Sequence, residues 1–304
     1  MRTKPWMHLA VCWLLKALFA AVWPVLAATL SGPSTVIILH TNDLHFDFNF
    51  REDFEQVVAY YRDRYPNVWL VDGGDIFVRH AHRWPVEDLA FYAERANFMI
   101  DTMNEVGYDV AVLGNHELDA KEWFTRDALR RAIFPLLGAN VEVLIEDQFD
   151  PPEPYVVFET VEGYTIAVLG ISIGRYGVAR ATNRDEAIRA YRHLGQEHDV
   201  WIALTHIGAN RDRSLAEKFG EIDVIIGGHS HTLLNPAEII NGVLVAQAGG
   251  NPHYVDPARP QSLGVIRLVI EDGDITQKSG KVLTLDGTGE ALSTLPDAAA
   301  LALP

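Results

Sequence analysis

Five short segments of the 304-residue sequence gather aspartate, histidine and asparagine, the residue types that can bind a metal ion. They are His40-Thr-Asn-Asp43-Leu-His45, Asp72-Gly-Gly-Asp75, Gly114-Asn115-His116-Glu117-Leu-Asp119, Thr205-His206 and Gly228-His229-Ser230-His231. Any one of them alone is more typical of a turn or a surface loop. Five in one chain are difficult to attribute to turn chemistry. Carboxylate, imidazole and amide-oxygen groups in this combination suit Mn, Zn or Fe better than Ca alone.

Each segment follows directly after a short run of Val, Ile and Leu that predicts a buried strand. These strands are expected at 35–39, 68–71, 109–113, 199–204 and 223–227, and further strands at 134–137, 165–170, 236–248 and 262–271. Apolar residues at helical spacing predict helices at 51–65, 86–106, 121–132, 184–197 and 211–219. The alternation indicates a single α/β domain. Because ligands bind at the carboxyl ends of strands in such folds, the five segments are expected to form one site.

The composition is that of a globular protein with a strongly acidic charge. Hydrophobic residues make up 48% of the chain, which excludes a disordered polymer. Acidic residues outnumber basic ones by 41 to 25, and the formal net charge is -16. Such a chain is a poor match for duplex nucleic acid, whose phosphates require basic partners. An anionic substrate would need a local positive focus such as bound metal. The single cysteine, Cys12, excludes a disulfide within the chain.

Residues 1–27 have the layout of a secretory signal peptide, with a basic start, an apolar stretch and Val25-Leu26-Ala27 as the cleavage site. We therefore expect an exported protein, periplasmic or extracellular, with no membrane span after cleavage. The alternative is a membrane anchor that stays uncleaved. A spanning helix needs about 20 apolar residues, and Lys16 and Pro24 interrupt this stretch. No feature of the sequence predicts the oligomeric state.

The order D-x-H, G-D, G-N-H-E, T-H and G-H-S-H is similar to the motifs of the calcineurin-like metallophosphoesterase superfamily. The longer strings ILHTNDLH, GNHELD and DVIIGGHSHT resemble the 5′-nucleotidase branch, specifically its N-terminal catalytic domain. The similarity runs from about Val36 to Ile270. It implies a four-layer α/β/β/α metallophosphoesterase sandwich as a catalytic domain at 35–285. The Ala- and Leu-rich residues 286–304 predict a C-terminal tail after this domain.

The resemblance also implies a role for each motif residue. Two divalent metal ions would be bound, with a water or hydroxide between them as the nucleophile. The first ion would be held by Asp43, His45 and His231, the second by Asn115, His206 and His229, and Asp75 would bridge the two. His116 would stabilise charge on the transferring group or protonate the leaving oxygen. Asp119 would orient His116 and favour its charged form, and His40 would support the neighbouring ligands.

The sequence departs from this branch after the catalytic domain. Full-length members carry a second, C-terminal domain that binds the nucleoside, whereas here a short tail follows the last predicted strand. The expected substrate is therefore a small phosphate ester, with a nucleotide as one candidate and with little discrimination among bases. Candidate substrate contacts are Arg79, Arg83 and Trp84, and further rim positions are Arg175, Tyr176, Arg180 and His253-Tyr254. The alternative for each of these residues is a solvated loop.

The sequence also allows functions of two other classes, a different ester hydrolase and a non-catalytic binding module. A phosphodiesterase or a hydrolase of sulfur-oxyanion esters could use the same scaffold and the same metals. The residues of the pocket wall, and not the metals, would select among these substrates. A non-catalytic module that binds metal or a partner is an alternative of a different class. Such a module would have no use for His116 and Asp119, so their presence favours an enzyme.

Overall fold

The computed structural model of the chain describes residues 32–46, 48, 51–78, 89–118, 123–174, 178–250, 261–286 and 295. The expected signal peptide at 1–27 lies outside the described residues, as does the expected tail at 286–304 except for residues 286 and 295. Among the described helices, none is both long enough and apolar enough to cross a membrane.

The first sheet joins four parallel strands to an antiparallel hairpin, in the order β14-β13-β1-β2-β3-β4. The parallel strands are β1 (Ser34–Thr41), β2 (Asn67–Asp72), β3 (Val110–Val112) and β4 (Leu136–Leu137). The hairpin is formed by β13 (Gln261–Glu271) and β14 (Asp274–Leu285), and β13 runs antiparallel to β1. Because β1, β2 and β3 are parallel, the loops that follow them lie at the same edge of the sheet.

The second sheet has the order β11-β12-β10-β9-β7-β6, with four parallel strands inside and an antiparallel strand at each edge. Its strands are β6 (Tyr155–Glu159), β7 (Thr165–Ile171), β9 (Val200–Thr205), β10 (Val224–Ile226), β11 (Glu238–Ile240) and β12 (Val243–Ala246). A separate two-stranded ladder pairs β5 (Val141–Val143) with β8 (Ala179–Ala181).

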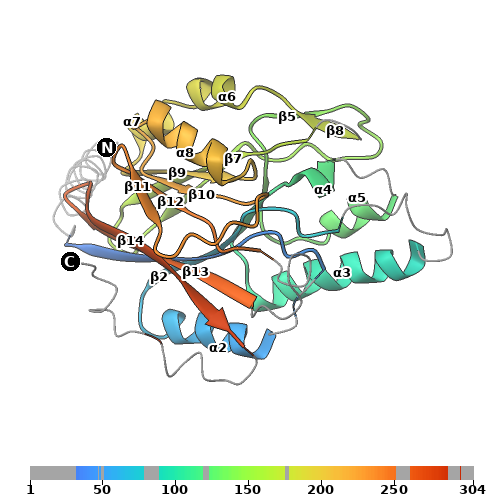
Figure 1. Ribbon diagram of the computed structural model, residues 1–304, viewed down its shortest axis with the longest axis horizontal. Coiled ribbons are helices and arrows are strands. Elements are labelled where there is room, and N and C mark those ends of the chain that lie inside the picture. Colours follow the sequence, from blue (N-terminus) through green and yellow to red (C-terminus); the bar gives the residue numbers. More distant parts are fainter. Residues whose placement is uncertain are drawn as a thin grey trace, which may run out of the picture.

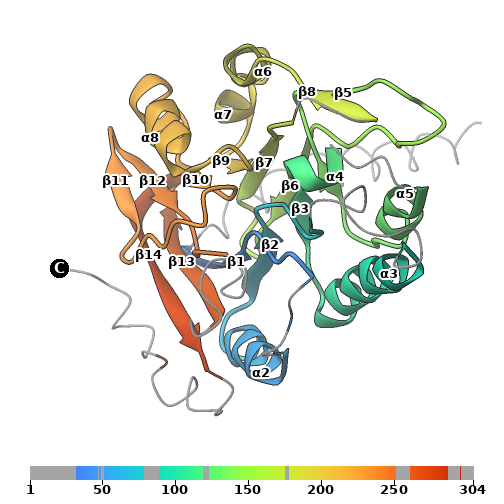
Figure 2. The same cartoon turned by 45° about the vertical axis from the view of Figure 1, so that its right-hand side comes forward.

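Helices cover the outer face of each sheet, as Figure 1 and Figure 2 show. The first sheet is covered by α2 (Arg51–Arg62), α3 (Leu89–Val106) and α5 (Trp123–Leu129), and the second by α6 (Arg184–Ala190), α7 (Leu194–Glu197) and α8 (Ala209–Lys218). The short helix α4 (Asn115–Leu118) follows β3 directly.

The alternation of side chains along the central strands produces three apolar layers. On β1, Val36 and Ile38 pack between the two sheets, while Ile37 and Leu39 pack toward α2 and α3. Since both faces of these strands are buried, their sequences are almost continuously apolar. A third cluster, which includes Trp201 on β9, packs between the second sheet and its helices. The four-layer α/β/β/α arrangement predicted from the resemblance is confirmed.

Two of the predicted elements are wrong in their extent, and a turn or a break explains each. The strand expected at 236–248 is a hairpin, because Asn241 and Gly242 both have positive φ, 49° and 82°, and reverse the chain. The helix expected at 184–197 is divided into α6 and α7, because the chain leaves the helical conformation at Tyr191, directly after α6 ends at Ala190. Strand β14 was not predicted, although Asp272-Gly273 before it is a typical hairpin turn with φ of 55° and 88°.

Candidate metal centre

The five histidine- and aspartate-bearing segments come together where the parallel strands of both sheets end. Three follow strands of the first sheet and two follow strands of the second. Asp43 and His45 follow β1, Asp75 follows β2, Asn115 and His116 begin α4 after β3, His206 follows β9, and His229 and His231 follow β10. The site is therefore built across the two sheets, from residues as far apart in sequence as Asp43 and His231.

One group of ligand-capable atoms comes from Asp43, His45 and His231. The Nε2 atoms of His45 and His231 lie 3.3 Å apart. The Oδ1 atom of Asp43 lies 3.4 Å from His231 Nε2 and 3.7 Å from His45 Nε2. All three residues are at least partly buried, and Asp43 is fully buried. Two nitrogens and one carboxylate oxygen thus converge on a single point, which is the donor arrangement of a divalent cation site.

A second group comes from Asp75, His206 and His229, next to the first. His206 Nε2 lies 3.0 Å from Asp75 Oδ2, and the rings of His206 and His229 are 5.2 Å apart between centroids. Asp75 also forms a group with His45 and His116. One carboxylate is therefore shared by neighbouring clusters, as a bridging ligand between two ions would be.

Backbone carbonyls set the orientation of three imidazole rings. The carbonyl of Phe77 accepts hydrogen bonds from Nδ1 of His45 at 2.9 Å and of His116 at 3.0 Å. The carbonyl of Gly73 accepts one from Nδ1 of His206 at 2.6 Å. Because a carbonyl can only accept, each Nδ1 carries a proton, and Nε2 is the nitrogen that faces the clusters. This arrangement is typical of metal-binding histidines.

The carboxylates are also held by hydrogen bonds. Asp43 Oδ2 accepts from Asn42 Nδ2 at 2.7 Å and from the His229 backbone N–H at 2.8 Å, which leaves Oδ1 toward the histidines. Asp75 Oδ1 accepts from the His116 backbone N–H at 2.9 Å. The amide oxygen of Asn115 is buried and has no hydrogen-bond partner in the described part of the chain. A buried orphan oxygen beside two histidine clusters fits a metal ion as its partner.

Glu117 is a functional residue that was not predicted from the sequence, and its carboxylate binds the loops that carry Asp75 and Asn115. It is fully buried and accepts backbone N–H groups from Gly114 at 2.8 Å, Phe77 at 3.0 Å and Asp75 at 3.2 Å. One carboxylate thereby ties the loop of Asp75 to the loop of Asn115. Its place in the G-N-H-E string was the available signal, but nothing in the spacing revealed which groups it would bind.

The backbone is strained at the same residues. Asp43, His45, Asp75, His229 and His231 all have positive φ, between 47° and 78°. Positive φ is uncommon for residues other than glycine, and such strain gathers at functional sites where the surrounding structure enforces it. At these positions the strain arises because the chain turns sharply after each strand, which brings the side chain to the cluster.

Burial and neighbouring charge shift the pKa values of these groups. Burial raises the pKa of Asp43 to about 6 and lowers the pKa of His45 and His229 to about 4, so both imidazoles are neutral at pH 7. Burial alone would lower the pKa of His206, but the adjacent Asp75 carboxylate raises it above its usual range. The same pair holds the pKa of Asp75 well below its usual range. Metal ligands must be deprotonated, so an ion bound at His206 would displace a proton.

Several predicted residues lie outside the described part of the chain: Asp119, Arg79, Arg83, Trp84, Arg175, Tyr176, His253 and Tyr254. Two others are described. Arg180 on β8 forms an ion pair with Glu142 on β5 at 2.7 Å, so its guanidinium is engaged on the outer ladder. His40 is buried against β13, where a Cβ on Gly264 would come within 1.9 Å of its Nε2.

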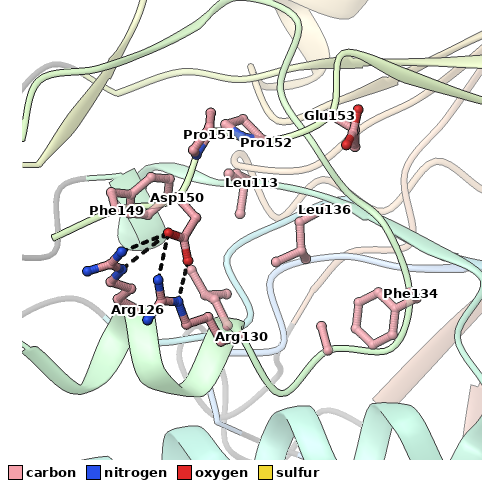
Figure 3. Close-up of a pocket in the computed structure, with 12 residues that line it drawn as sticks. Leu113, Arg126, Arg130, Phe134, Leu136, Phe149, Asp150, Pro151, Pro152 and Glu153 are labelled. Atoms are coloured by element: carbon pink, nitrogen blue, oxygen red, sulfur yellow. Dashed lines mark hydrogen bonds and ion pairs between the residues drawn. The ribbon is translucent and has the colours of Figure 1, made fainter. Parts of the chain in front are cut away.

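A cavity of about 190 Å³ lies beside α5. Figure 3 shows the apolar side chains that line it, among them Phe134 and Phe149, and Asp150 held between Arg126 and Arg130. None of the residues that line it is one of the ligand-capable residues of the centre. The cavity therefore does not mark the site of metal binding.

Comparison with known proteins agrees with this geometry. Residues 36–233 match the family model described as calcineurin-like phosphoesterase. The chain is 29% identical over 256 residues to the trifunctional nucleotide phosphoesterase protein YfkN of Bacillus subtilis, covering 69% of this chain and 17% of that protein. It is 30% identical over 253 residues to the 5′-nucleotidase of Homo sapiens, covering 73% of this chain and 41% of that protein.

The fold matches that of a solved 5′-nucleotidase precursor from Thermus thermophilus, with a TM-score of 0.67 and 22% identity over 85% of this chain and 58% of that one. The curated 5′-nucleotidases that it matches are about twice its length, with 41% of the human and 50% of the Diplobatis ommata protein covered. Since the family model spans well over half of the chain, including all five segments, the chain is a metallophosphoesterase and belongs to the calcineurin-like phosphoesterase family.

Proposed function

We propose that the protein is a two-metal-dependent hydrolase of phosphate esters that acts in the manner of a 5′-nucleotidase. The observation that carries this proposal is the sharing of Asp75 between adjacent histidine and aspartate clusters. Relatives named 5′-nucleotidase and nucleotide phosphoesterase support a nucleotide or another small phosphate monoester as the substrate.

In this proposal the ligands divide into two sets. Asp43, His45 and His231 would hold the first ion, Asn115, His206 and His229 would hold the second, and Asp75 would contribute to both. The groups Asp43–His45–His231 and Asp75–His206–His229 support this division. Such a pair of ions, when bound, activates water at neutral pH and neutralises charge on the phosphoryl oxygens. The chain supplies placement, because backbone carbonyls orient the rings of His45 and His206 and the Asp43 carboxylate holds the backbone N–H of His229.

His116 is the proposed catalytic group that does not bind metal. Its Nδ1–H is held by the Phe77 carbonyl, and its Nε2 lies 3.7 Å from Asp75 Oδ2. From this position the imidazole can stabilise charge on the transferring phosphoryl group or donate a proton to the leaving oxygen. Asp119, which lies outside the described residues, is proposed to favour the charged form of this ring. Arg79, Arg83 and Trp84 remain the proposed substrate contacts. We also propose that the protein is exported.

The test is hydrolysis of phosphate monoesters and diesters by metal-free protein before and after addition of Mn, Zn, Co or Mg. We expect activity on an aryl phosphate to vanish on chelation and to return with a divalent ion. Asp75→Asn should weaken both ions, because both sites lose charge. Asp109→Asn is the control, since Asp109 accepts the Leu70 N–H at the opposite end of the sheet.

Full activity of the metal-free protein would contradict the two-metal proposal. Activity restricted to diesters, or to sulfur-oxyanion esters, would instead favour one of the alternative reactions on this scaffold. The panel of esters therefore decides the reaction class, and the chelation series decides the mechanism.

A further inference from the structure

Asp212 on α8 is a fully buried carboxylate that is not one of the proposed metal ligands, with 1% of its surface exposed. It lies between the carboxyl ends of β9 and β10, the two strands of the second sheet that carry His206, His229 and His231. We propose that Asp212 is a positioning residue that sets His206 and His229 for the second metal ion. This inference rests on the proposed two-metal function.

Asp212 contacts the strand end that carries His206. The hydroxyl of Thr205, which is fully buried, donates to Asp212 Oδ1 at 2.6 Å. His206 is the next residue, and its own N–H is fixed by the Ile171 carbonyl at 2.7 Å. The hydrogen bond of Thr205 therefore restrains the backbone immediately before the ligand, while the Gly73 carbonyl orients the ring.

The other oxygen of the same carboxylate contacts the strand end that carries His229. A Cβ on Gly227 would lie 2.2 Å from Asp212 Oδ2, so this oxygen packs directly on the glycine backbone. Gly227 is two residues before His229. Helix α8 meets the same segment again at its first residue, where the Ala209 N–H donates to Ser230 Oγ at 3.0 Å. One side chain thus touches the approach to both ligands.

Stability alone gives a poor account of this carboxylate. Burying a carboxylate is costly unless its oxygens are well paired. In the described residues, Asp212 Oδ2 has no hydrogen-bond partner and Oδ1 has the hydroxyl of Thr205. Glu117 offers a parallel in the first sheet, where a buried carboxylate that is not a proposed ligand joins two ligand loops through three N–H groups. Asp72 is a further case in the first sheet, where it is fully buried and accepts from the hydroxyl of Thr41 and the N–H of Gly74. Buried carboxylates that are not proposed ligands thus contact ligand-bearing loops in both sheets.

The experiment compares Thr205→Val, Thr205→Ser and Asp212→Asn with the parent chain by calorimetric titration of Mn²⁺ into metal-free protein. Thr165→Val is the matched control, because Thr165 Oγ1 donates to Asp199 Oδ2 at 3.0 Å at the opposite end of the same sheet. The free energy of unfolding of each metal-free variant is measured in urea, so that a loss of fold is separated from a loss of metal affinity.

We expect Thr205→Val and Asp212→Asn to weaken the second Mn²⁺ by about 10- to 100-fold and to leave the first within about threefold, as for groups that orient metal ligands. Thr205→Ser keeps the hydroxyl and should restore the parent affinity, and Thr165→Val should change neither site. Val is close in shape to Thr, so Thr205→Val decides the question if Asp212→Asn does not fold.

Parent protein that binds two ions, together with Thr205→Val that binds both with unchanged affinity, would overturn the role of Asp212 and leave the proposed function intact. Equal weakening of both ions in the variants would also overturn it, because it would show a general loss of structure. Parent protein that binds no divalent ion would overturn the proposed function, and the role of Asp212 with it.

Discussion

Two backbone carbonyls determine how three of the imidazoles at the centre can react. Since Phe77 and Gly73 accept from Nδ1, the rings of His45, His116 and His206 present Nε2 to the clusters. The rings of His45 and His116 share one carbonyl and lie 4.7 Å apart between centroids. A ligand ring and the proposed catalytic ring are therefore aligned by the same peptide group.

At this scale, His116→Ala is expected to lower kcat by about 10²- to 10⁴-fold, the usual contribution of a general acid. The metal content should not change, because His116 is not one of the proposed ligands. Steady-state kinetics and elemental analysis on the same sample measure the two quantities. An unchanged kcat, or a loss of metal equal to the loss of activity, would contradict the proposed role.

Glu117→Gln is expected to lower the free energy of unfolding by about 1–3 kcal/mol, the cost of mismatching a buried hydrogen-bond network. The reason is that an amide group would place its own N–H donors against the backbone N–H groups of Asp75 or Phe77. Urea denaturation of the metal-free protein measures the change. Glu142→Gln, on the exposed β5–β8 ladder, serves as the control and should cost less than about 1 kcal/mol.

The elements place these residues through the direction of their strands. The parallel strands β1, β2 and β3 end together in the first sheet, and β9 and β10 end together in the second. Helix α5 is attached to the loop before β6 by ion pairs of Asp150 with Arg126 in the helix and with Arg130 directly after it, visible in Figure 3.

This attachment should depend on pH. Hydrogen bonds from Arg130 and Arg126 lower the pKa of Asp150 to about 2, so the ion pairs contribute stability above pH 4 that is lost as the pH falls toward 2. Because the groups are exposed, Asp150→Asn should cost less than about 1 kcal/mol at pH 7. Urea denaturation of both proteins at several pH values should show the difference shrinking below pH 4. The exposed turn residue Asp63, changed to Asn, is the control, and a constant difference down to pH 2 would contradict the assignment.

On the scale of the whole molecule, the centre depends on both sheets and on their packing. His45 and His231, whose Nε2 atoms lie 3.3 Å apart, come from different sheets. The side chains of Val36, Ile38, Ile202 and Leu204 form the layer that holds these sheets together. An ion bound between the sheets would therefore stabilise their packing as well as the local loops.

For the chain as it stands, we expect nucleoside monophosphates to be hydrolysed with little discrimination among bases. Metal ions recognise the phosphate common to all of them, and base selection requires a shaped wall that contacts the base. The ratio of kcat/KM among the common nucleotides should stay within about tenfold, equivalent to about 1.4 kcal/mol. Competition assays with the four monophosphates measure it, and a hundredfold preference for one base would contradict the expectation.

The order of the elements and the identity of the metal-capable residues could be read from the sequence, because both depend on short-range spacing. Val, Ile and Leu runs predicted β1 and β9, and the polar residues directly after them were recognisable in the same windows.

The roles of Glu117 and Asp212 were not readable in this way. The Glu117 carboxylate accepts backbone N–H groups, and the Asp212 carboxylate accepts the Thr205 hydroxyl and packs against Gly227, 15 residues away. Local spacing identifies none of these contacts. The hairpin β11–β12 was missed because Asn241 and Gly242 reverse the chain inside a stretch that was predicted as one strand. The meeting of His206 with Gly73 across 133 residues depends on the packing of two sheets, and pairing over such distances follows from the folded chain and not from local sequence.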